Sequence, residues 1–70
     1  MTESVYKVIE LVGSSPDGWE EATKQAVAKA SKSLRDLRIV EVVKMDAKIE
    51  GGKIVMYRSR VKISFKFESE

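Results

Sequence analysis

The chain has 70 residues, with 13 lysine and arginine residues against 11 aspartate and glutamate residues, and it contains neither cysteine nor histidine. This length allows one domain, residues 1–70, and the composition excludes disulfides, thiolate metal sites and histidine chemistry. A domain this small is marginally stable alone, so association with further copies is the remaining means of stabilisation.

The net charge of +2 is spread along the chain without a dense basic block, which argues against a nucleic-acid partner. The longest apolar runs are only a few residues, so we expect no membrane span and no signal peptide. The expected location is therefore the cytoplasm.

The first predicted strand covers residues 5–12, which are rich in β-branched and apolar side chains. A cluster of turn residues follows and offers two alternative helix starts. In one, Ser15 is the N-cap and Pro16 the first helical residue. In the other, Asp17 and Glu20 form a capping box. The sequence does not decide between them.

The predicted helix covers about residues 16–34 and buries a stripe of mostly small side chains. Small residues allow the helix axis to lie close to the sheet that it covers. The residues of this stripe, at three- and four-residue spacing, are Trp19, Ala22, Ala26, Val27, Ala30 and Leu34. Trp19 is on the stripe, so we expect it to pack in the core.

Two long predicted strands, residues 38–49 and 54–67, are joined at Gly51 and Gly52. A pair of glycines supplies the positive φ angles that a two-residue hairpin turn requires. The third strand alternates clearly, with one apolar and one charged face. Its odd positions are Val55, Tyr57, Ser59, Val61, Ile63, Phe65 and Phe67, and its even positions are Met56, Arg58, Arg60, Lys62, Ser64, Lys66 and Glu68.

These elements predict an α+β fold of order β-α-β-β, in which a three-stranded antiparallel sheet partly wraps one helix. Strands of twelve residues span about 40 Å, whereas a compact domain of this size is only about 28 Å across. The strands must therefore bend sharply or overhang, and overhanging strands bury their surplus on other copies. We expect a homo-oligomer of closed symmetry; the alternative is a strongly coiled monomeric sheet.

The chain resembles the dodecin family over nearly its whole length. The resemblance rests on "VYKVIELVGSSPDGWEEA", on "ASKSLRDL", on the Gly-Gly turn, on the tyrosine before Arg58 and on "VKISFKFE". It implies a dodecin-like domain that assembles into a hollow homododecamer with flavin pockets between subunits. It also implies a storage or sequestration role without catalysis.

The resemblance implies pocket positions at Ile39, Glu41, Asp46, Arg58 and Lys66. Flavin-binding members carry a tryptophan that stacks on the flavin where this chain has Ile39 within "LRIVEV". They tend to have a hydrogen-bonding glutamine at Arg58, and often an arginine beside the flavin phosphate at Asp46. Isoleucine offers no aromatic face, and arginine donates hydrogen bonds without accepting them. These differences predict that the chain is not an ordinary flavin binder.

The pairs Tyr57-Arg58 and Ser64-Lys66 are similar to a subset of dodecins that lacks the tryptophan and is tied to metal ions. Ca²⁺ prefers oxygen ligands, and the candidate carboxylates are Glu41, Asp46 and Glu50. They form no dense acidic loop, so such a site is assembled between subunits or is weak. The alternatives are flavin (FMN or riboflavin) sequestration as in the rest of the family, and a purely structural assembly.

Local patterns give simpler interpretations for some of these residues. Arg58 is expected to form a salt bridge with a carboxylate on a neighbouring strand, and Asp46 to lie on a solvated face. An enzymatic function is not expected, because no nucleophile–base pair is present and "GGK" at 51–53 is a hairpin turn. Glu41 is expected to be a buried carboxylate in need of a partner, because it alternates with the apolar Ile39, Val43 and Met45.

Overall fold

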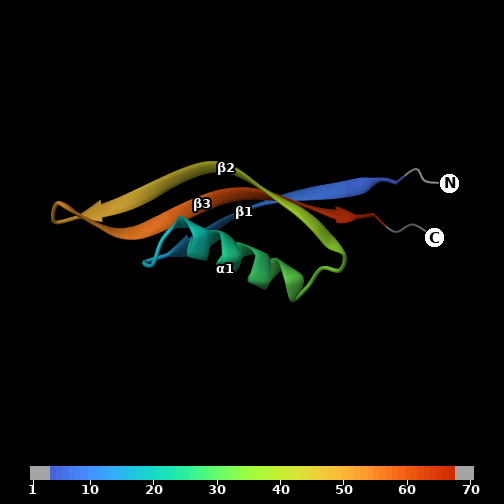
Figure 1. Cartoon of the computed structure of the whole chain (residues 1–70), viewed down its shortest axis with the longest axis horizontal. Coiled ribbons are helices and arrows are strands. Elements are labelled where there is room, and N and C mark those ends of the chain that lie inside the picture. Colours follow the sequence, from blue (N-terminus) through green and yellow to red (C-terminus); the bar gives the residue numbers. More distant parts are fainter. Residues whose placement is uncertain (1–3, 68–70) are drawn as a thin grey trace.

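A computed structural model describes residues 4–67 and shows the element order β-α-β-β (Figure 1). The strands are β1 (Tyr6–Ser15), β2 (Leu37–Glu50) and β3 (Lys53–Lys66), and the helix is α1 (Trp19–Ser31). The predicted fold class is confirmed. Residues 1–3 and 68–70 of the predicted domain lie outside the described residues, and so does Glu68, the last of the predicted even positions. Over residues 4–67 the structure contains no helix with the length and apolar character that a membrane crossing needs.

The three strands form one antiparallel sheet in the order β1-β3-β2, so β3 is central and pairs on both sides. The hairpin of β2 and β3 turns at Gly51 and Gly52, whose φ angles are 59° and 76°. Both angles are positive, as the predicted glycine turn requires. The outer edges of β1 and β2 have no strand partner within the described protomer.

The core lies between α1 and the centre of the sheet. Three alanines of the helix, Ala22, Ala26 and Ala30, are buried, and the last two pack with Val61 and Ile63 of β3. A Cβ atom added to Gly13 of β1 would lie 2.0 Å from the Ala22 carbonyl oxygen, so only glycine fits there. The predicted close approach of helix and sheet is confirmed.

The helix begins later than either predicted start. Its N-cap is Gly18, whose φ of 138° favours glycine, and no side chain caps the helix. Ser15 is still part of β1, and its hydroxyl accepts a hydrogen bond of 3.0 Å from the main-chain N–H of Asp17. Both predicted N-caps are therefore wrong. The Ser15 hydroxyl stabilises the turn between strand and helix, and both Ser15 and Asp17 precede the actual N-cap, Gly18.

The helix also ends earlier than predicted, at Ser31 instead of Leu34. The main-chain N–H of Leu34 donates to the Ala30 carbonyl oxygen at 2.9 Å, which closes a last turn beyond the helix. The Leu34 side chain packs against the core from this turn. Its predicted packing is therefore confirmed, although Leu34 lies outside the helix.

The protomer is elongated, with extents of 55 × 20 × 13 Å and a radius of gyration of 14.5 Å. A compact chain of this length would have a radius of gyration of about 11 Å. The 13-residue α1 is about 20 Å long and covers only part of the hairpin. Beyond the start of α1 the hairpin continues as two strands, residues 47–57, here called the overhang (Figure 1). The sequence left two alternatives, a sharp bend of the strands and an overhang, and the structure shows the overhang.

Candidate functional site

The face of the sheet that α1 leaves uncovered, here called the outer face, holds most of the predicted pocket positions. The buried residues of β3 are at odd positions, so its even positions point to the outer face. Directly opposed residues of an antiparallel pair point to the same side. Three predicted pocket residues stand opposite even positions of β3: Ile39 opposite Ser64, Glu41 opposite Lys62 and Asp46 opposite Arg58.

A bulge in β2 changes which residues share a face. The register with β3 shifts between Val42 and Lys44, so Val42 and Met45 both stand opposite helix-facing residues of β3. Ile39 and Glu41, on the other side of the shift, point to the outer face, and Glu41 is exposed. The predicted buried carboxylate is therefore wrong, and so is the predicted common face of Ile39, Glu41, Val43 and Met45.

Asp46 and Arg58 form a bidentate ion pair across β2 and β3. Arg58 Nε donates to Asp46 Oδ1 at 2.7 Å, and Arg58 Nη2 donates to Asp46 Oδ2 at 2.8 Å. These hydrogen bonds, together with the positive charge of Arg58, hold the pKa of the Asp46 carboxyl below its usual value. The predicted salt bridge of Arg58 is confirmed, and it engages both carboxylate oxygens of Asp46.

Trp19 lies at the start of α1 and fixes the backbone of Asp46 from the helix side. Its indole N–H donates to the Asp46 carbonyl oxygen at 2.9 Å, and its ring meets Tyr57 edge-on with centroids 4.9 Å apart. The side chain is 39% exposed, so the prediction that Trp19 packs in the core is wrong for the protomer. The reason is its place at the start of the helix, where β1 has ended and only the two strands of the overhang continue.

The three candidate metal ligands do not converge within one protomer. The Asp46 carboxylate is occupied by Arg58, and Glu50 lies at the hairpin tip, 3.3 Å from Lys48 Nζ. Glu41 has no ion pair in the part of the chain that the structure describes. Among residues 4–67, no three acidic side chains are close enough to hold a metal ion together.

Sequence reasoning missed Glu10, which joins the charged centre of the outer face. Glu10 of β1 and Glu41 of β2 both stand opposite Lys62, so two carboxylates flank one lysine of the central strand. Glu10 Oε2 also lies 3.6 Å from Arg60 Nη1. The charged alternation of β3 indicated such partners, but the register that brings Glu10 there is a property of the assembled sheet.

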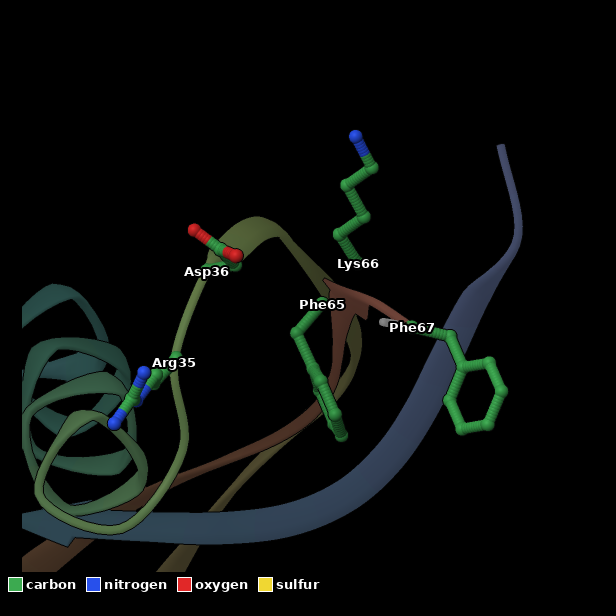
Figure 2. Close-up of a pocket in the computed structure, with 5 residues that line it drawn as sticks. All are labelled: Arg35, Asp36, Phe65, Lys66 and Phe67. Atoms are coloured by element: carbon green, nitrogen blue, oxygen red, sulfur yellow. The ribbon is translucent and has the colours of Figure 1, made fainter. Parts of the chain in front are cut away.

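Lys66 lies near one end of the outer face, two residues beyond Ser64, and borders a cavity of about 580 Å³. This cavity is open to solvent and is lined by the turn before β2 and the end of β3, where the Lys66 main-chain N–H donates to the Asp36 carbonyl oxygen at 3.2 Å. Figure 2 shows that the side chains of Lys66 and Arg35 point in different directions. The ring of Phe67 also points away from them. A binding pocket needs convergent polar groups, and this cavity does not provide them.

Comparison with known proteins agrees with this architecture. A family model described as Dodecin matches residues 5–68. A protein named calcium dodecin from Mycobacterium tuberculosis is 40% identical over 63 residues, which is 90% of this chain and 89% of that protein. The dodecin of Thermus thermophilus is 38% identical over 64 residues, which is 91% of this chain and 93% of that protein.

Solved structures are similar over the same length. The dodecin from Streptomyces coelicolor superposes with a TM-score of 0.94 over the whole of both chains, at 37% identity. The calcium dodecin of Mycobacterium tuberculosis is described as a calcium-chelating antigen with a novel calcium-binding site. It superposes with a TM-score of 0.81 over 93% of each chain, at 42% identity.

Proposed function

The chain belongs to the dodecin family, and from this membership we propose a non-enzymatic binding or storage protein that assembles into a hollow homododecamer. We propose that its ligand is a cation, with Ca²⁺ as the first candidate, instead of a stacked flavin. The observation that carries this proposal is the ion pair of Asp46 and Arg58 on the outer face.

The ion pair weakens the case for flavin because it occupies two pocket positions at once. Arg58 has its Nε and one Nη group directed at a protein carboxylate, so these donors are engaged before any ligand arrives. The Asp46 carboxylate also brings a negative charge where a flavin phosphate would need a positive one. The third position, Ile39, is 65% exposed and offers apolar area without an aromatic face.

Self-assembly is supported by the apolar surface that the protomer leaves exposed. Strand residues on both sides of the sheet are uncovered, more than a small monomeric domain normally exposes. The large apolar residues at least half exposed are Val5, Val8, Ile39, Met45, Ile49 and Ile54. Further copies of the chain would cover this surface, as the strand lengths predicted.

Glu41 is the first candidate for a cation ligand. It is exposed on the outer face with no ion pair among residues 4–67, whereas Asp46 and Glu50 are each paired with a basic side chain that a cation would have to displace. Ca²⁺ takes about 6–8 oxygen ligands, so one carboxylate is insufficient. Glu41 side chains from neighbouring copies, with main-chain carbonyls and water, would complete such a site.

Titration calorimetry with Ca²⁺ on metal-stripped assembly tests this proposal. We expect binding by the native protein, at least a tenfold weaker affinity in Glu41→Gln, and no change in the control Asp36→Asn in the turn before β2. The Ca²⁺ proposal is wrong if the native protein gives no heat, and an unaltered assembly would then favour the purely structural role.

Flavin binding is the second candidate, favoured by one observation. Val8, Ser64 and Ile39 lie side by side across the three strands on the outer face, and both apolar members are more than half exposed. A flavin ring could cover this apolar row without stacking on an aromatic residue. Quenching of riboflavin fluorescence by micromolar protein would support this alternative, and we expect no quenching.

A further inference from the structure

Four hydrogen-bonded steps join the core to the ion pair on the outer face. Thr23 Oγ1 donates to the Trp19 carbonyl oxygen at 2.9 Å and lies 2.8 Å from Ser59 Oγ. A hydroxyl group has one proton, so Ser59 is the donor in the second of these bonds. The Trp19 indole N–H donates to the Asp46 carbonyl oxygen, and the Asp46 carboxylate accepts from Arg58. These five residues, here called the hydrogen-bond series, therefore run from the helix side of the sheet to the outer face.

Ser59 is a polar residue at a position that the fold would fill with an apolar one. It is fully buried on the helix side of β3, where the next residue on the same side is the buried Val61. A buried hydroxyl group costs free energy unless it is hydrogen-bonded, so Ser59 depends on Thr23. Buried polar pairs of this kind favour one arrangement of their elements over others. The pair therefore fixes where the first turn of α1 lies on the sheet.

Trp19, which this turn carries, contacts both strands of the ion pair. Its indole binds Asp46 of β2, and its ring meets Tyr57, the residue before Arg58 on β3. Tyr57 stands opposite Ser15, the last residue of β1, so support from the third strand ends here. An arginine and a carboxylate form two parallel hydrogen bonds only in one relative placement. Trp19 thus holds the two strands in place where the ion pair needs it.

The state of the ion pair decides which charge the outer face offers to a ligand. Both side chains are partly exposed, and exposed ion pairs are weak by themselves. Lys44 and Arg60 stand opposite each other in the adjacent row. After Arg58, their charges also hold the pKa of the Asp46 carboxyl below its usual value, so they act close to the pair. If Asp46 released Arg58, three basic groups would be left for an anion, and the arginine fork matches a phosphate.

We propose that Trp19 is a positioning residue that determines ligand charge: it holds Asp46 on Arg58, and the closed pair keeps the outer face from binding phosphate or phosphate esters. Thr23 and Ser59 support this role because they fix the turn from which Trp19 reaches the sheet. This inference rests on the proposed function, in which the outer face takes a cation, and it names the residues that select against an anion.

Titration calorimetry with inorganic phosphate at low ionic strength tests the proposal. Trp19→Phe keeps an aromatic ring beside Tyr57 but has no N–H to donate. We expect it to bind phosphate about fivefold more tightly than the native protein, the effect of one lost hydrogen bond on the closed pair. Asp46→Asn should give at least as large a gain. The control Val27→Ala loosens the packing of α1 outside the hydrogen-bond series, and it should leave phosphate binding unchanged.

A double variant separates positioning from a general loss of order. Trp19→Phe combined with Asp46→Asn should bind phosphate no more tightly than Asp46→Asn alone, because Trp19 acts through Asp46. Thr23→Val, which removes the hydroxyl group at nearly constant volume, should change phosphate binding in the same direction as Trp19→Phe. It provides the test if Trp19→Phe does not fold.

The proposal is wrong if the gains of Trp19→Phe and Asp46→Asn add, if Val27→Ala gains as much, or if the folded variants bind phosphate no better than the native protein. None of these measurements uses Ca²⁺. A native protein without Ca²⁺ affinity would therefore overturn the cation proposal alone, whereas the expected phosphate pattern would still establish the role of Trp19.

Discussion

The hairpin of β2 and β3 has a covered part and an uncovered part, although similar residues build both. Near α1, Val61 and Ile63 are 0% and 1% exposed because the helix and β1 enclose them. In the overhang, Ile49 and Ile54 belong to the same class of side chain and are 67% and 51% exposed. The difference shows that strand composition alone does not decide burial in this protein; the presence of a second layer decides it.

The two parts therefore depend on different interactions. The covered part is stabilised within one protomer by the helix and three paired strands. The overhang has two strands and no helix over it, and isolated two-stranded hairpins are marginally stable in water. Its order should depend on contact with other copies and hence on protein concentration.

The largest expected effect is the destabilisation of the covered part by a substitution at Gly13. In Gly13→Ala the new Cβ would lie 2.0 Å from the Ala22 carbonyl oxygen and 3.1 Å from the Ala26 Cβ, so the helix must move off the sheet. We expect a loss of at least about 3 kcal/mol in the free energy of unfolding, because overpacking against a main-chain atom cannot relax by a rotamer change. Urea denaturation measures it. The neighbouring Ser14→Ala is the control and should have little effect; equal stability of both variants would contradict the close helix–sheet contact.

A matched pair of isoleucines separates the two parts of the hairpin. Ile63→Ala removes a buried side chain and should cost about 2–5 kcal/mol at every protein concentration. Ile54→Ala removes an exposed side chain of the overhang and should lower stability only where the protein is assembled. The measurement is urea denaturation over a hundredfold range of protein concentration. A concentration-independent loss in Ile54→Ala would show that the overhang is buried within its own protomer.

The order and type of the elements were predictable, because alternation on β3 and the alanine stripe are local patterns. The helix start was not, since Ser15 and Asp17 fit a cap equally well in a helix and in the turn that precedes Gly18. The exposure of Trp19 was also missed. The apolar spacing along the helix shows which residues face the sheet, but it does not show where the three-stranded part of the sheet ends.

The ion pair of Asp46 and Arg58 was predictable from the sequence, whereas the geometry of the outer face was predictable only in part. The resemblance indicated Asp46 and Arg58, and the alternation of charges favoured a salt bridge between strands, which the structure contains. The environment of Glu41 was not predictable, because the bulge between Val42 and Lys44 moves it to the other face. A bulge depends on the fit of two strands, and one strand's sequence does not specify it.

The smallest expected effect concerns Asp46, at the boundary between the covered part and the overhang. Arg58 lowers the pKa of the Asp46 carboxyl in the folded state relative to its ordinary value of 3.8. A lowered folded-state pKa gives a contribution that is fully present above the unfolded pKa and is lost as the pH falls through the folded one. The native protein should therefore lose this part of its stability below about pH 4, whereas Asp46→Asn should lack it at all pH values.

Fluorescence of Trp19, the only tryptophan, measures the effect at the place where it arises, because its indole binds the Asp46 carbonyl oxygen. We expect acid to change the native emission below about pH 4 and to change that of Asp46→Asn less. Asp36→Asn, in the turn before β2, removes a carboxylate that has no ion pair among residues 4–67, and it should keep the native profile. If Asp46→Asn and the native protein respond equally to acid, the ion pair does not link the outer face to the start of α1, and the boundary between the two parts of the hairpin is held by Trp19 and Tyr57 alone.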